Sequence, residues 1–156
     1  LSVNSSTLGG LFGKIGEAGT VENLTVSGTI TGTYSHTLGA GGIAAENHGT
    51  IKNCINQCNI TASAYYVGFG GIVGVNWGTV INCANMGNIN VSSIDVGVNA
   101  GGISGCNCKF IANSYNTGTI SFDYNKFDFG NCGGLVSYNV CMDGWNRQFI
   151  SYCKLL

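Results

Sequence analysis

The sequence contains no proline, few charged residues and no long hydrophobic run. Charged residues make up 8% of the 156 positions, whereas an average soluble domain has about 25%. The formal net charge is −1 and the six lysines and arginines are scattered, so no basic patch is available for nucleic acid or an anionic membrane. No apolar stretch approaches the roughly 20 residues of a membrane-spanning helix. These absences predict no nucleic-acid partner and no membrane insertion.

Glycine is abundant instead, with 26 residues, and 44% of the positions are hydrophobic. This hydrophobic content is sufficient for a buried core, which argues against disorder. Strong helix formers are scarce among the many glycines and asparagines, so strands are expected and helices are not. The length suits a single domain that covers residues 1–156.

A repeat organises most of the chain. A Gly-Gly-aliphatic signature occurs five times, and successive copies are 29 to 32 residues apart, with the glycine pairs at 9–10, 41–42, 70–71, 101–102 and 133–134. The third copy is the clearest and reads GGIVGVNWGTVINCANMGNINVSS from Gly70 to Ser93. Alignment on this copy places asparagines in three shared columns: Asn47, Asn76, Asn107 and Asn139; Asn53, Asn82 and Asn113; and Asn56, Asn85 and Asn116.

An apolar column runs beside the asparagines. It contains Ile60, Ile89 and Ile120, and a two-residue insertion in the first repeat brings Asn23 and Ile30 into the same register. Each repeat shows three short runs with strand-like composition, which in the third copy are 71–75, 79–83 and 88–92. A period near 30 residues with three strands is incompatible with a helical solenoid.

These features predict an all-β fold, a single-domain parallel β-solenoid of about five turns with three short strands each. Equivalent strands would stack about 4.8 Å apart. The asparagine columns would then form ladders in which each side-chain amide bonds to the next, which satisfies groups that are costly to bury alone. The coil is expected to be right-handed from the general chirality preference of parallel connections.

The pattern G-G-[Ile/Leu]-x-Gly-x-Asn-x-Gly-Thr-[Ile/Val]-x-Asn-Cys resembles the GLUG motif, a repeat of bacterial surface proteins, adhesins and immunoglobulin-A metallopeptidases. The resemblance covers most of the chain and is best from Gly41 to Ser121. It departs in the last repeat, where Met142–Trp145 replace the expected Gly-Thr-Ile. In those proteins the motif lies outside the catalytic machinery, so the resemblance implies a surface repeat without enzymatic activity.

The cysteines suggest two disulfide pairs. Cys54 and Cys83 share a column in adjacent turns, so their Cα atoms should lie about 4.8 Å apart, within disulfide range. Parallel neighbours hold their Cβ atoms slightly too far apart for an ideal bridge, so a reduced, stacked pair stays open as the alternative. Cys108 and Cys141 occupy nearly equivalent places and form the second candidate pair. The other four cysteines allow too many connectivities to choose one: Cys58, Cys106, Cys132 and Cys153.

An extracellular or cell-surface location is expected. The even number of eight cysteines and the four Asn-x-Ser/Thr sequons are typical of an oxidising, secretory environment. The candidate glycosylation sites are Asn4, Asn23, Asn59 and Asn90.

The two ends of the sequence suggest self-assembly. Residues 1–6 resemble the third strand of a repeat, residues 149–153 resemble the second, and neither end carries a polar cap. We therefore expect copies to stack head to tail into an open filament, as subunits of an extracellular fibre, through Leu1, Val3, Ile150, Tyr152 and Leu155. The open alternative is a segment of a longer repeat array in one polypeptide.

A second hypothesis is a surface adhesin whose aromatic loops, with Trp77, Phe127 and Phe129, contact glycans or a host surface protein. A third is a non-catalytic repeat region of a larger cell-surface protein. The segment Thr29–Thr33 has the alternation of a threonine array of the ice-binding kind, but the same motif is not repeated in other turns.

Catalytic and metal-binding patterns are weak. Glu46 and His48 would share a face of a strand, but no other repeat has such a pair. Cys106 and Cys108 lack the spacing of a zinc module, and the acidic residues after Phe122 lack the geometry of a calcium loop. We predict no enzyme, no metal and no cofactor.

Overall fold

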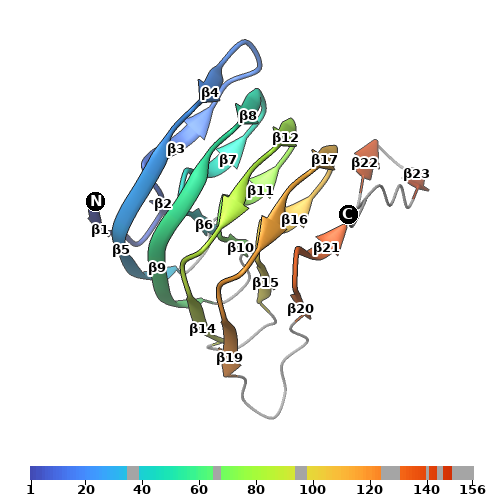
Figure 1. Cartoon of the computed structure of the whole chain (residues 1–156). Coiled ribbons are helices and arrows are strands. Elements are labelled where there is room, and N and C mark those ends of the chain that lie inside the picture. The colour runs from blue at the N-terminus through green and yellow to red at the C-terminus, as the bar shows by residue number, and fades with distance from the viewer. Residues whose placement is uncertain are drawn as a thin grey trace.

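The computed structural model describes residues 1–34, 39–64, 68–93, 98–123, 131–139, 141–143 and 146–148, the last two stretches by their backbone alone. These residues form an all-β parallel solenoid of about four turns, and none of them is helical (Figure 1). Successive turns lie side by side from β5 to β17 and β19. The predicted fold class is confirmed.

Four parallel sheets form the faces of the solenoid, and each turn contributes to all of them. Sheet A contains β1 (Ser2–Asn4), β5 (Thr25–Tyr34), β9 (Ile55–Ala64), β13 (Ala84–Asn85), β14 (Ile89–Ser93), β18 (Tyr115–Asn116) and β19 (Ile120–Asp123). Sheet B contains β2 (Leu8–Gly9), β6 (Gly39–Gly41), β10 (Gly68–Gly70), β15 (Asn99–Gly101) and β20 (Asn131–Gly133). Sheet C contains β3 (Phe12–Ile15), β7 (Ala44–Asn47), β11 (Val73–Asn76), β16 (Ser104–Asn107) and β21 (Val136–Asn139). Sheet D contains β4 (Thr20–Glu22), β8 (Thr50–Lys52), β12 (Thr79–Ile81) and β17 (Phe110–Ala112).

Two details differ from the expectation. Each turn has four faces and not three, because the Gly-Gly signature is a corner that separates sheet B from sheet C. The turns number about four and not five, because the fifth signature adds only β20 and β21 before the chain forms an antiparallel pair, β22 (Cys141–Asp143) with β23 (Asn146–Gln148). The handedness of the coil stays a prediction.

The predicted isoleucine column is the centre of the core. Ile30 pairs with Ile60, Ile60 with Ile89, and Ile89 with Ile120 along sheet A. The first three are completely buried. Burial of each such side chain contributes about 2 to 3 kcal/mol to folding, so repetition of one residue in every turn gives the solenoid a continuous apolar spine.

The Gly-Gly corner is explained by the asparagine ladder that lies against it. A Cβ on Gly42 would collide with the side chain of Asn56, and one on Gly71 with that of Asn85. The first glycine of each pair is equally restricted, because a Cβ on Gly70 would meet the carbonyl oxygen of Val73. The signature therefore marks the place where backbone and ladder approach too closely for a side chain.

Two asparagine ladders are buried and run in one direction. Nδ2 of Asn47 donates to Oδ1 of Asn76 at 2.8 Å, and Asn76 donates in the same way to Asn107 at 2.8 Å. In the second ladder Asn56 donates to Asn85 at 2.8 Å, and Asn85 to Asn116 at 2.7 Å. The first ladder continues to Oδ1 of Asn139 at 2.8 Å. The predicted ladders are confirmed in both columns.

The third ladder lies at the exposed corner between sheets D and A. Its members share a positive φ, between 48° and 56°, and are Asn23, Asn53, Asn82 and Asn113. Here the later turn donates to the earlier one: Nδ2 of Asn53 to Oδ1 of Asn23 at 3.2 Å, and Nδ2 of Asn82 to Oδ1 of Asn53 at 3.1 Å. Asparagine is one of the few residues that tolerate this left-handed conformation.

Candidate functional site

The outer face of sheet A is a regular grid of short polar side chains. Alternate residues of each strand are exposed or half-buried, and the parallel register aligns them from turn to turn. Three columns contain Ser, Thr or Asn at every position except one aspartate: Thr29, Asn59, Asn88 and Thr119, of which the last two come just before β14 and β19; Thr31, Thr61, Asn90 and Ser121; Thr33, Ser63, Ser92 and Asp123. Neighbours along a column lie one strand spacing apart, about 4.8 Å.

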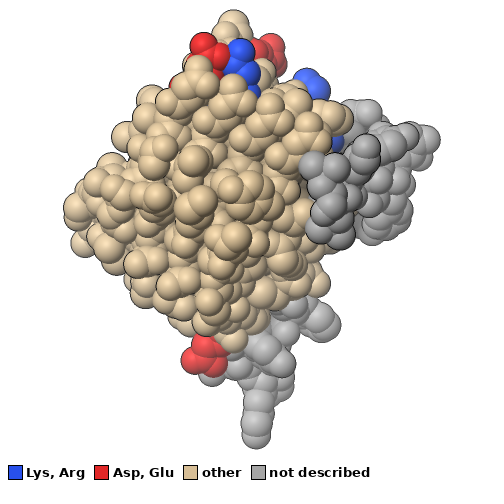
Figure 2. Space-filling view, in the orientation of Figure 1, with Lys and Arg blue, Asp and Glu red and all other residues tan. Residues whose placement is uncertain are grey.

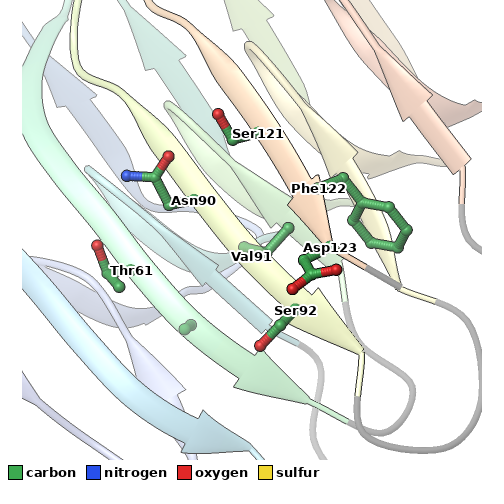
Figure 3. Close-up of a pocket in the computed structure, with 8 residues that line it drawn as sticks. Thr61, Asn90, Val91, Ser92, Ser121, Phe122 and Asp123 are labelled. Carbon is green, nitrogen blue, oxygen red and sulfur yellow. The ribbon is translucent and has the colours of Figure 1, made fainter. Parts of the chain in front are cut away.

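A shallow groove of about 280 Å³ lies on this grid, across β9, β14 and β19. In Figure 3, Asn90 lies between Thr61 and Ser121, and Asp123 lies beside Ser92. Phe122 lies at the same end of the groove as Asp123. The outward lining therefore combines one carboxylate with hydroxyl and amide groups, which both donate and accept hydrogen bonds. The inward positions Ala62, Val91 and Phe122 form the floor and belong to the core.

The middle of this face carries no charge among the described side chains. In Figure 2 the blue and red residues lie at the upper and lower margins of the visible face. Apart from Asp123, the described charged side chains lie on or beside sheets C and D: Lys14, Glu17, Glu22, Glu46, Lys52 and Lys109. The grid is thus neutral and polar, and the ion pair Lys52–Glu22, at 2.6 Å, belongs to another face.

Glu46 is at the centre of a separate polar cluster on sheet C. Its side chain is only 7% exposed, and its Oε2 lies 3.1 Å from Nε2 of His48 and 3.2 Å from Nζ of Lys14. The His48 ring stacks on Trp77, with ring centroids 6.3 Å apart. Lys14 and Glu46 are register partners in adjacent turns. The carboxylate is thus held between two nitrogen donors, an arrangement that pairs a buried charge.

Cys54 and Cys83 stack in adjacent turns as expected, and they are thiols and not a disulfide. The reduced alternative therefore holds for this pair. Both residues are buried, and each Sγ–H also has a carbonyl acceptor two residues earlier, Lys52 O at 3.2 Å and Ile81 O at 3.3 Å. Parallel register explains the result, because side chains of directly stacked residues run alongside each other.

The contact between the two thiols separates their pKa values. A hydrogen bond from the Cys83 thiol lowers the pKa of Cys54 to about 7, against the opposing effect of burial. The same hydrogen bond, together with burial, raises the pKa of Cys83. The pair thus shares one proton over a wide pH range, as interacting titratable groups do. Of the second predicted pair, the Cys141 side chain lies outside the described part of the chain.

Three of the four sequon asparagines lie on the outer face of sheet A. Asn4, Asn59 and Asn90 are on β1, β9 and β14, and Asn23 is at the positive-φ corner. All four are exposed. Oδ1 of Asn59 already accepts the backbone N–H of Asn88 at 2.9 Å. Glycosylation at these residues stays a prediction.

The expected assembly residues are only partly described. Leu1 and Val3 extend sheet A: the N–H of Thr29 donates to the carbonyl oxygen of Leu1 at 3.0 Å, and Val3 is the register partner of Ile30. Residues 1–6 were expected to resemble the last strand of a turn, and β1 occupies that place. The remaining three candidates lie outside the described residues: Ile150, Tyr152 and Leu155.

The described residues contain no candidate metal-ion cluster and no candidate membrane-spanning helix. None of them forms a group of three or more His, Cys, Asp or Glu side chains that could hold a metal ion, and none belongs to a helix long and apolar enough to cross a membrane. Comparison with other proteins is also negative: no family model, no curated protein and no solved structure matches the chain.

Sequence reasoning missed the polar grid, although a signal was present. The Thr-x-Thr alternation of Thr29–Thr33 is not repeated literally, because the equivalent positions of other turns carry Asn or Ser. Asn59-x-Thr61-x-Ser63 is the register partner of Thr29-x-Thr31-x-Thr33. Comparison of the outward positions as a class of short polar residues would have revealed the columns.

Proposed function

We propose that this protein is an extracellular structural protein, a subunit of a fibre assembled by head-to-tail stacking of β-solenoids. The observation that carries the proposal is the location of exposed large hydrophobic side chains. Of the seven in the described part of the chain, six lie in the first and last turns: Leu1, Leu11, Phe12, Phe110, Tyr115 and Tyr138. The seventh is Met86, in a central turn.

The ends of a solenoid are suited to such stacking because each turn presents a row of backbone hydrogen-bonding groups to the next. A second copy that continues the parallel register would bury the aromatic side chains of the last turn against the first turn of its neighbour. Such a contact joins two different surfaces and does not close, so it produces a filament. The resemblance to GLUG surface repeats and the sequons support the extracellular part of the proposal.

Electron microscopy of the purified chain tests this proposal. We expect concentration-dependent filaments, and we expect Phe12→Glu and Phe110→Glu to abolish them, because each places a charge in the contact. Met86→Glu is the matched control: it alters an equally exposed side chain, 43% compared with 39% for Phe12, away from both ends. A monomer at every concentration would contradict the proposal and favour further turns from the same polypeptide as the natural neighbours.

A surface binding module is the second candidate, favoured by the groove on sheet A. The aromatic loops expected to serve it contribute little here, because Phe127 and Phe129 lie outside the described residues and Trp77 stacks on His48. The groove residues Asn90, Ser121 and Asp123 belong to regular strands instead.

A further inference from the structure

The outer face of sheet A has the properties of a binding surface for a neutral partner. Its three columns have no charged group before Asp123, so a polyanion or a polycation would gain no electrostatic attraction there. Its hydroxyl and amide groups both donate and accept hydrogen bonds, which suits a partner that is itself rich in hydroxyl groups. Neutral carbohydrate is the class of molecule that meets both conditions.

The direction of the columns defines how such a partner would lie. The column Thr31, Thr61, Asn90 and Ser121 crosses the strands and presents one polar group per turn, at intervals of about 4.8 Å. This interval is close to the advance of one sugar ring along an extended polysaccharide. A chain laid along the solenoid axis would therefore meet the same type of group with each successive sugar.

The groove supplies the strongest contacts along this path. Asn90 lies at its centre, with Thr61 and Ser121 on either side, and the carboxylate of Asp123 lies near Ser92. A carboxylate accepts two hydroxyl donors at once, as adjacent hydroxyls of a sugar require. Phe122, the register partner of the buried Val91, packs against the core from the inner side of the sheet, so the polar side chains alone provide the contacts on the outer face.

We propose that the outer face of sheet A binds an extended, neutral polysaccharide that runs along the solenoid axis, with about one sugar per turn and its tightest contacts in the groove around Asn90 and Asp123. This inference deepens the second candidate function and is independent of end-to-end stacking. It requires Asn4, Asn59 and Asn90 to be unmodified, because an attached glycan would occupy the same face.

Calorimetric titration of the whole chain, produced without N-glycans, with cello-, β-1,3-gluco- and manno-oligosaccharides of increasing length tests the proposal. We expect one series to bind about tenfold more tightly as its length grows from two to four sugars, with little further gain, because the grid spans four turns. Polygalacturonate and heparin serve as acidic probes and are expected not to bind.

Variants separate the groove from the rest of the molecule. Asn90→Ala and Thr61→Trp are expected to weaken binding about tenfold or more, one by removing an amide and the other by filling the path. Thr20→Ala, an exposed threonine of sheet D, is the matched control and should bind as the unmodified chain does. Asp123→Asn keeps the shape of the side chain and removes only its charge. Because the partner is neutral, this variant is expected to lose less binding affinity than Asn90→Ala.

Several results would overturn the proposal. They are failure of all neutral oligosaccharides to bind, preferential binding of an acidic probe, or glycans found by mass spectrometry on Asn4, Asn59 or Asn90 of the native protein. A loss of self-association in Asn90→Ala, without any carbohydrate binding, would assign the face to a second copy of the chain. Because Phe12→Glu leaves sheet A untouched, it should abolish filaments and retain carbohydrate binding, so the two proposals fail separately.

Discussion

The buried and the exposed asparagine ladders use the same residue for different physical reasons. Asn76, fully buried, donates to Oδ1 of Asn107 and to the carbonyl oxygen of Gly78, and its own Oδ1 accepts the N–H of Gly78. Asn82 is exposed, and its φ of 54° is in the left-handed region. The first position requires the complete hydrogen-bonding capacity of the amide, and the second requires mainly tolerance of an unusual backbone. Repetition of one residue type within a chain can therefore have two different physical causes.

The largest effect is expected from removal of a buried amide. Asn76→Ala leaves Asn47, Asn107 and Gly78 without their partner in a dry interior. With about 1 to 3 kcal/mol for each unsatisfied group, we expect a loss of about 4 kcal/mol in the free energy of unfolding, measured by denaturant titration. A loss below about 1 kcal/mol would show that water or a relaxed backbone satisfies these groups instead. The buried ladder would then not depend on the hydrogen bonds of the amide.

A smaller effect is expected from a glycine-to-alanine substitution that adds a methyl group next to the second buried ladder. Gly71→Ala would place its Cβ against Asn85 and the carbonyl oxygen of Gly102, and overpacking of this kind costs about 3 kcal/mol. Gly134→Ala is the matched control, because it is the second glycine of another signature and has no atom within 4 Å of the added Cβ. Equal melting temperatures for the two variants would contradict the close approach of corner and ladder.

At the exposed ladder, we expect stability to depend on the backbone conformation of the asparagine more than on its side-chain amide. Asn82→Val forces a β-branched residue into the left-handed region and is expected to cost about 2 kcal/mol. Asn82→Gly removes the same hydrogen bond to Asn53 but keeps the backbone, and should cost about 0.5 kcal/mol. Thermal unfolding of both variants measures the difference. Comparable losses would mean that the hydrogen bond, and not the conformation, stabilises this corner.

A change of pH, without any substitution, is expected to act through the thiols that follow the exposed ladder. Below pH 7 both the native and the unfolded thiols are protonated. Between pH 7 and pH 9 native Cys54, with its pKa lowered to about 7, has lost a proton that the unfolded chain retains, so stability should rise with pH by an amount on the order of 1 kcal/mol after allowance for solvent screening. Above pH 9 the raised pKa of Cys83 reverses the trend.

Denaturant unfolding at pH 6 to 10 in the presence of a reducing agent checks this dependence. Cys83→Ala removes the hydrogen-bond donor, so its stability should lack the rise between pH 7 and pH 9. A rise of the same size in this variant would assign the titration to a group outside the thiol pair.

The repeat made the architecture predictable because its most constrained residues are also its most regular. Ile30, Ile60 and Ile89 repeat because each fills the same space in the core, and the ladder asparagines repeat because each satisfies the next. Sheet B could not be recognised, since strands such as Gly39–Gly41 and Gly68–Gly70 are largely glycine and carry no strand propensity.

The candidate site was less predictable because its positions require only a short polar residue and not one particular amino acid. Outward positions need only be short and polar, so Thr61, Asn90 and Ser121 follow one another in a column without repeating. The state of the Cys54–Cys83 pair was also undecided in the sequence, because column position fixes the Cα atoms but not the direction of the side chains.

The stacking of equivalent positions is tested most directly by solution NMR of the side-chain amides. We expect through-space contacts between the amide protons of Asn47 and Asn76 and between those of Asn76 and Asn107, which lie in successive turns. Contacts from Asn76 to its sequence neighbours alone, with none to Asn47 or Asn107, would contradict the parallel, in-register solenoid.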